Sequence, residues 1–151
     1  MSLNVRILVP VDGSECSLRA LEFASGIASE LHGEIIICHV VEIARAAMMS
    51  GGEPQLVAGC LEELQTEGTA ILAEAMNHVA SGVPVSTRAA EGSATAEIER
   101  LATEIQPSFV VIGSHGRTGL NRLVMGSVAE GVVRSSPVPV MVVPHARHSS
   151  K

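Results

Sequence analysis

The sequence predicts an α/β fold in which a five-stranded, parallel, open sheet lies between two layers of helices, a doubly wound, Rossmann-like arrangement. Short apolar runs alternate with helical periodicity along the whole 151 residues. This alternation favours parallel strands joined by right-handed crossover helices. The length fits one domain, expected over residues 1–144, with a polar tail at 145–151. We expect the strand order 3-2-1-4-5 and a ligand site where that order reverses.

The first half of the chain predicts two strands and one helix. An apolar run at residues 5–11 predicts a buried strand, and residues 34–41 predict a second. Between them, Ser14 is the expected N-cap of a helix that Gly33 ends. Residues 44–55 show no clear period, so we expect a mobile loop there, whose Met48 and Met49 could cover a ligand or simply fill gaps.

A longer helix is predicted over residues 55–80, although Gly59 and Gly68 lie inside it. The apolar residues expected on its inner side are Leu56, Cys60, Leu61, Leu64, Ile71, Leu72, Met76 and Val79. The remaining elements should follow in this order: a strand at 83–89, a helix from Ser93 to Ile105, a strand at 108–113, a helix at 127–135 and a strand at 138–143.

Composition excludes several classes of protein. A net charge of −6 and only two aromatic residues argue against nucleic-acid binding, which needs basic surfaces or stacking rings. No apolar run is long enough to span a membrane. The three cysteines lack metal-ligand spacing and no signal peptide is visible, so we expect a cytoplasmic protein without a metal site.

The stretch from Gly113 to Gly126 is the strongest functional signal. It is a long connection that follows a purely apolar strand, and its glycines let backbone N–H groups approach a ligand closely. A run of such groups, followed by a helix N-terminus, favours phosphate. Ser127 and Glu130 fit a capping box at that helix start. The stretch lacks the Walker lysine and the Rossmann glycine pattern.

The spacing Gly113-x2-Gly116-x9-Gly126-Ser127 resembles the glycine motif of the ATP-binding branch of the universal stress protein family. Residues 7–14, 39–41 and 136–143 are also similar to that family, so the resemblance covers essentially the whole chain. It implies that Asp12 lies near the adenosine and that the Val40 backbone meets the adenine edge. It further implies that the glycine motif, Ser127 and Val128 surround ribose and phosphates.

We therefore expect ATP, or ADP or AMP, with or without Mg²⁺, in the loops after the first, second and fourth strands. The candidate binding residues are Pro10, Val11, Asp12, Val40, Gly113, Ser114, His115, Gly116, Arg117, Gly119, Gly126, Ser127 and Val128. Asp12 should serve ribose, base or hydrated Mg²⁺, or else only an Asx turn, because a bare carboxylate repels phosphate. His115 could touch phosphate, but a solvent-facing loop histidine is the favoured reading.

The function expected from these observations is that of a stress-response regulatory protein that binds an adenine nucleotide. No catalytic residue is evident, so any ATP hydrolysis should be slow. The alternatives are a slow ATPase or ATP-dependent transferase, and a dimeric scaffold without nucleotide. The resemblance also implies a homodimer through strand 138–143, and Pro139 favours an edge position for that strand.

Overall fold

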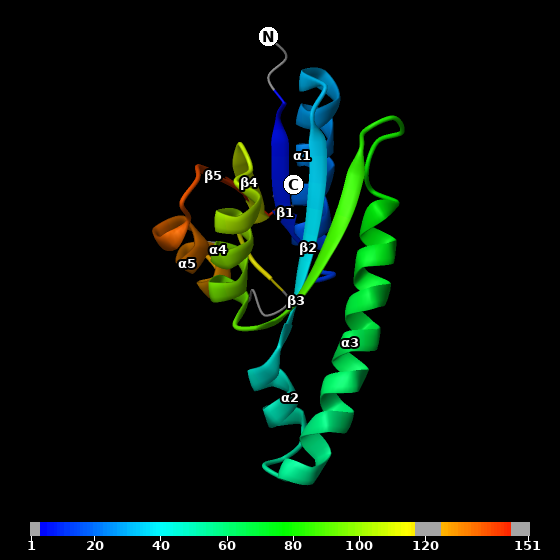
Figure 1. Cartoon of the computed structure of the whole chain (residues 1–151), viewed down its shortest axis with the longest axis vertical. Helices are drawn as coiled ribbons and strands as arrows, with labels where there is room; N and C mark the ends of the chain where they lie inside the picture. Colours follow the sequence, from blue (N-terminus) through cyan, green and yellow to red (C-terminus); the bar gives the residue numbers. More distant parts are fainter. Residues whose placement is uncertain (1–3, 117–124, 146–151) are drawn as a thin grey trace, which may run out of the picture.

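Five parallel strands form one sheet in the order β3-β2-β1-β4-β5 (Figure 1). The computed structural model describes residues 4–116 and 125–145. In chain order the elements are β1 (Arg6–Pro10), α1 (Glu15–Leu31), β2 (Glu34–Glu42), α2 (Ile43–Met49), α3 (Pro54–Met76), β3 (Val85–Gly92), α4 (Ala94–Ile105), β4 (Phe109–Gly113), α5 (Ser127–Ser135) and β5 (Val140–Val143). The predicted fold class and strand order are confirmed.

The sheet separates two apolar cores. Successive side chains of a strand point to opposite faces, so Ile7 and Val9 pack with α1 and α3, whereas Leu8 packs with α4 and α5. All three of these β1 side chains are fully buried. The cores consist of aliphatic side chains and alanines, as the scarcity of aromatic residues requires.

Helix α1 begins as the sequence predicts. The side chain of Ser14 accepts a hydrogen bond from the backbone N–H of Ser17 at 3.2 Å, which satisfies one of the free donors of the first turn. At the other end the left-handed residue is His32, with φ 53°, and not Gly33. Gly33 is required for space, because a Cβ atom there would lie 2.6 Å from the carbonyl oxygen of Val5.

The prediction of a loop over residues 44–55 is wrong for the first half of that segment, which forms helix α2. This segment is rich in alanine and methionine, which are good helix formers, but so short a helix also needs packing against the rest of the protein. That contact comes from Ala46, which is fully buried against Val41 and Leu64. A turn through residues 50–53 then leads into α3.

Helix α3 is continuous but shorter than predicted, since it ends at Met76 instead of residue 80. Two residues expected on its inner side are exposed: Leu56 by 52% and Met76 by 44%. The prediction fails at Leu56 because the first turns of α3 extend beyond the sheet beside α2, where no strand covers them (Figure 1). Pro54 occupies the first turn, where its missing N–H costs nothing.

Strands β2 and β3 run past the end of β1. The pairing of β1 with β2 ends at Pro10 opposite Cys38, whereas β2 and β3 stay paired to Glu42 opposite Gly92. We call residues 39–42 and 89–92 the β2–β3 overhang. The overhang explains why β3 lies at Val85–Gly92 and not at the predicted 83–89: its pairing follows the full length of β2.

Candidate functional site

A cavity of about 660 Å³ lies beyond the carboxyl ends of β1, β2 and β4, at the position where the strand order reverses. Eleven predicted site residues line it: Pro10, Val11, Asp12, Val40, Gly113, Ser114, His115, Gly116, Gly126, Ser127 and Val128. The other two, Arg117 and Gly119, lie outside the described residues. The structure thus brings together three loops that are far apart in the sequence.

Asp12 sits where β1 meets the turn before α1. Its Oδ1 accepts a hydrogen bond from the backbone N–H of Ser14 at 2.9 Å, which is the Asx-turn geometry. Its backbone N–H donates to the hydroxyl of Ser17 at 3.3 Å. The carboxylate is therefore held in a fixed position on the cavity wall, so that the structural role and a ligand contact are compatible.

The glycines of the motif allow close backbone packing around Asp12. A Cβ atom at Gly116 would lie 2.6 Å from Oδ2 of Asp12, and one at Gly126 would lie 3.0 Å from the carbonyl oxygen of Ser114. The N–H of Gly126 donates to that same carbonyl at 2.6 Å. The hydrogen bond from Gly126 to Ser114 therefore joins both ends of the glycine-rich connection beside the cavity, and a side chain at Gly116 or Gly126 would require its neighbour to shift.

The start of α5 differs from the predicted capping box. Gly126, not Ser127, is the N-cap, and Ser127 is the first helical residue. The close approach of Gly126 to Ser114 fixes the cap one residue earlier than expected. Glu130 pairs with Arg134 at 2.7 Å instead of reaching back to the cap. No side chain of the described residues caps α5, and its first turn lines the cavity.

His115 is buried, with 7% of its surface exposed, so the expected solvent-facing histidine is wrong. Its Nδ1 lies 3.0 Å from the hydroxyl of Ser114, and its ring centroid lies 6.2 Å from that of His145. Its Nε2 is buried and has no hydrogen-bond partner in the part of the chain that the structure describes. His115 therefore belongs to the cavity wall, where the hydroxyl of Ser114 holds one of its ring nitrogens.

Several residues of the cavity were not predicted from sequence. His39 donates from Nδ1 to the carbonyl of Val11 at 2.8 Å and so joins β2 to the end of β1. Arg45 of α2 and Glu67 of α3 form an ion pair at 3.3 Å on the far wall. The alanines and methionines around Arg45 were the signal for α2, and with α2 in place this residue would have been a candidate.

Cys38 lies beneath the cavity at the last position where β1 and β2 are paired. Complete burial raises the pKa of its thiol to about 12, and Arg88 lowers the pKa only in part. The thiol is therefore protonated at neutral pH and acts as a small apolar side chain. It contributes to the floor of the cavity and has no nucleophilic character.

The charge of the wall is unfavourable for an anion. Among the described lining residues, Asp12, Glu42 and Glu67 are acidic and Arg45 is the one guanidinium. A bound phosphate must therefore rely on backbone N–H groups and on the positive end of the α5 dipole. Residues 4–116 and 125–145 contain no cluster of three or more potential metal ligands, and no helix there could cross a membrane.

Comparisons with known proteins agree with this geometry. The sequence profile of the Universal stress protein family matches residues 4–144. Universal stress protein MJ0531 of Methanocaldococcus jannaschii is 33% identical over 144 residues, which cover 94% of this chain and 83% of that protein. The structure of universal stress protein UspA from Lactobacillus plantarum aligns with a TM-score of 0.77 at 25% identity, covering 95% of this chain and 99% of the other.

A further solved structure is a universal stress protein in complex with cAMP. It aligns with a TM-score of 0.70 at 26% identity and covers 94% of this chain and 98% of its own. Each of these three alignments therefore covers at least 94% of this chain.

Proposed function

Because this chain belongs to the universal stress protein family, we propose that it binds an adenine nucleotide, with ATP as the first candidate, and serves as a stress-response regulatory protein. The observation that carries this proposal is the first turn of α5, which lines the cavity without a side-chain cap among the described residues. Its N–H groups and its dipole offer positive partial charge to a phosphate.

The phosphate end of the ligand would lie between Gly116 and Gly126. The hydroxyl of Ser127 supports this assignment, because Ser127 is helical and exposed at the cavity and does not cap its own helix. His115, which lines the same wall, is a further proposed contact. Arg117 and Gly119, which lie outside the described residues, remain proposed contacts from the glycine-rich connection.

The adenosine end would lie between β1 and β2. Pro10 and Val11 give an apolar floor, and the Val40 backbone would meet the base edge. Asp12 would accept from a ribose hydroxyl or hold Mg²⁺ through water, since a carboxylate facing bare phosphate would repel it. One structural relative is a complex with cAMP, which supports an adenine nucleotide as the ligand.

The cavity supports binding more than catalysis. Among the described lining residues, the Ser114 hydroxyl lies 3.0 Å from Nδ1 of His115, but no third group there orients that imidazole, and the Cys38 thiol stays protonated. We propose that ATP hydrolysis, if measured, is slow, and that nucleotide occupancy itself is the signal.

We also propose a homodimer through β5. This strand pairs with β4 on one side and forms the edge of the described sheet on the other. Met141 is 39% exposed on it, and an apolar edge of this kind is suited to pairing with a second copy.

Isothermal calorimetry with ATP, ADP, AMP, cAMP and GTP tests the nucleotide proposal. We expect the adenine nucleotides to bind the wild-type protein. The Gly116→Val substitution should lower their affinity by at least about tenfold, because the valine side chain would displace Asp12. Gly26→Ala is the matched control, since no atom lies within 4 Å of a Cβ atom there.

Two results would contradict the proposal. Equal affinity of the wild type and Gly116→Val would exclude the loop geometry. If no adenine compound binds and mass spectrometry of the purified protein finds none, the scaffold alternative is favoured. Multiple turnovers of phosphate release with a defined second substrate would instead favour the transferase.

A further inference from the structure

Helix α2 exposes an apolar face that the nucleotide site does not use. Ile43 is 47% exposed and Met48 is 81% exposed, and Ala44 and Ala47 are exposed between them. Residues spaced by four are neighbours on a helix, so these four side chains form one continuous stripe. Ala46, on another side of the helix, is fully buried against α3.

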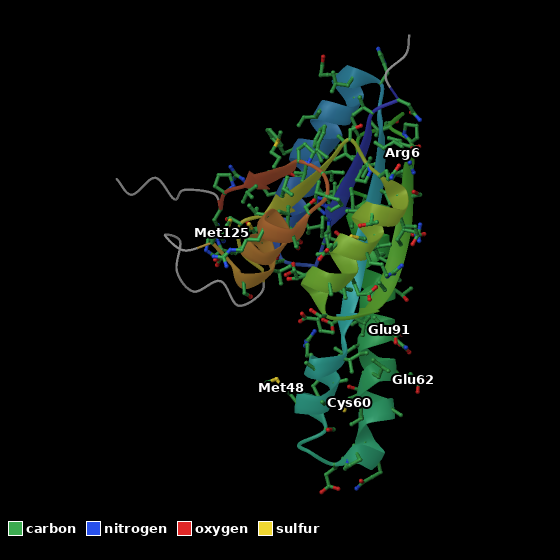
Figure 2. All side chains as sticks on the ribbon, turned by 60° about the vertical axis from the view of Figure 1, so that its left-hand side comes forward. Arg6, Met48, Cys60, Glu62, Glu91 and Met125 are labelled. Atoms are coloured by element: carbon green, nitrogen blue, oxygen red, sulfur yellow. The ribbon has the colours of Figure 1, made fainter. Side chains whose placement is uncertain are left out.

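The stripe lies on a projecting part of the molecule. Figure 1 shows α2 and the first turns of α3 extending beyond the sheet as a helical hairpin. In Figure 2, Met48 lies on the side of α2 that faces away from α3. Met49, 45% exposed, extends the apolar surface at the end of α2. An apolar surface on a projecting element is a feature of interaction sites, because it has no role in the core.

The hairpin also holds half of the net charge of the chain. Residues 42–66, from the end of β2 through the first turns of α3, contain four glutamates and one arginine, a net charge of −3, while the whole chain has −6. The arginine is Arg45, which pairs with Glu67. Glu42 precedes α2, Glu53 follows it, and both are exposed. The stripe is therefore bounded at both ends by carboxylates, and Figure 2 shows Glu62 on the opposite side of α3.

We propose that the α2 stripe is a docking site for an amphipathic helical segment of another protein, with apolar side chains on one side and lysines or arginines flanking them. The apolar side would cover Ile43 and Met48, and the basic side chains would reach Glu42 and Glu53. Charge complementarity of this kind steers association and selects the partner.

The same charges disfavour other occupants. A second copy docking stripe to stripe would bring two hairpins of net charge −3 together, which is repulsive at short range. An anionic lipid surface would be repelled in the same way. A basic segment gains from both the apolar contact and the charge.

The probe for this proposal is a fluorescein-labelled helical peptide of leucine and lysine, measured by fluorescence anisotropy. We expect Ile43→Gln with Met48→Gln to weaken binding by at least about tenfold, because the apolar contact is lost without a change of charge. Leu31→Gln is the control, since Leu31 is 50% exposed on α1, outside the hairpin. Glu42→Gln with Glu53→Gln should weaken binding and reduce its dependence on salt between about 50 and about 300 mM.

Met48→Lys serves as a second variant, because at 81% exposure it does not threaten the fold. This variant should bind the leucine–lysine peptide more weakly than the wild type does, while its circular dichroism spectrum stays unchanged. The proposal is overturned if Ile43→Gln with Met48→Gln binds as the wild type does, or if a leucine–glutamate peptide binds equally well. It is also overturned if that double variant changes the sedimentation of the protein alone, or if the wild type floats with lipid vesicles.

Discussion

His78 joins two helices through their carboxylates. Its Nδ1 lies 2.8 Å from Glu22 of α1 and its Nε2 lies 3.4 Å from Glu74 of α3. The hydrogen bond to Glu22 is the main reason that the pKa of His78 is raised above its usual value of 6.5, and Glu74 adds to it. The imidazolium thus acts as a pH-dependent link between the two helices that cover one face of the sheet.

We expect the stability difference between the wild type and His78→Gln to depend on pH. A raised pKa in the folded state stabilises the protein fully below pH 6.5, and this contribution is lost as the pH rises through the raised pKa. Because the glutamates are exposed, the difference should not exceed about 1 kcal/mol. Urea unfolding followed by circular dichroism at about pH 5.5 and about pH 9 measures it. A difference that is equal at both pH values would contradict the prediction.

At the scale of the element, α3 contains two glycines in unlike surroundings. A Cβ atom at Gly59 meets no atom within 4 Å, whereas one at Gly68 would lie 2.8 Å from Cδ2 of His39. That imidazole cannot move freely, because it donates a hydrogen bond to the carbonyl oxygen of Val11. One helix therefore provides both a test position and its control.

We expect Gly59→Ala to stabilise the protein by about 0.5–1 kcal/mol, because alanine loses less backbone entropy in a helix. Gly68→Ala should instead destabilise it by about 1–3 kcal/mol, since the added methyl group overpacks the contact with β2. Urea unfolding measures both changes; circular dichroism is the suitable signal because the chain has no tryptophan or tyrosine. If both substitutions stabilise the protein, the His39 side chain can move away from the added methyl group with little loss of free energy, and the prediction for Gly68→Ala is wrong.

The elements also show what sequence alone could predict. All five strands and four of the five helices were expected, because apolar periodicity and caps such as Ser14 are local signals. Helix α2 was missed because its stability depends on Ala46 reaching Leu64, a contact between residues far apart in the sequence. The exact start of α5 was missed for the same reason, since Gly126 is fixed by Ser114.

The candidate site likewise contains residues that the sequence predicted and residues that it did not. The glycine spacing and Asp12 were visible because they follow strands directly, and the structure brings them to one cavity. The burial of His115 and the Arg45–Glu67 pair depend on how loops and helices meet in space. No local sequence pattern predicts these two features, because they exist only once the whole chain has folded.

At the scale of the whole molecule, the open edge of β5 leads to a prediction about assembly. If β5 pairs with its copy as proposed, Met141→Lys would place like charges near each other across the symmetry axis. We expect this variant to sediment as a monomer where the wild type sediments as a dimer. Met48→Lys, which adds the same charge far from β5, should leave the assembly unchanged. A dimer that tolerates Met141→Lys would place the interface elsewhere.

The β2–β3 overhang makes the two halves of the cavity mechanically unequal. Its floor belongs to the centre of the sheet, where β1 has a hydrogen-bonded neighbour on each side. In the wall formed by residues 39–42, β3 is the one neighbouring strand among the described residues, and α2 follows at its tip. A two-stranded ribbon bends more easily than a complete sheet. We therefore expect that wall, more than the buried strands beneath it, to adjust when ligands of different length are bound.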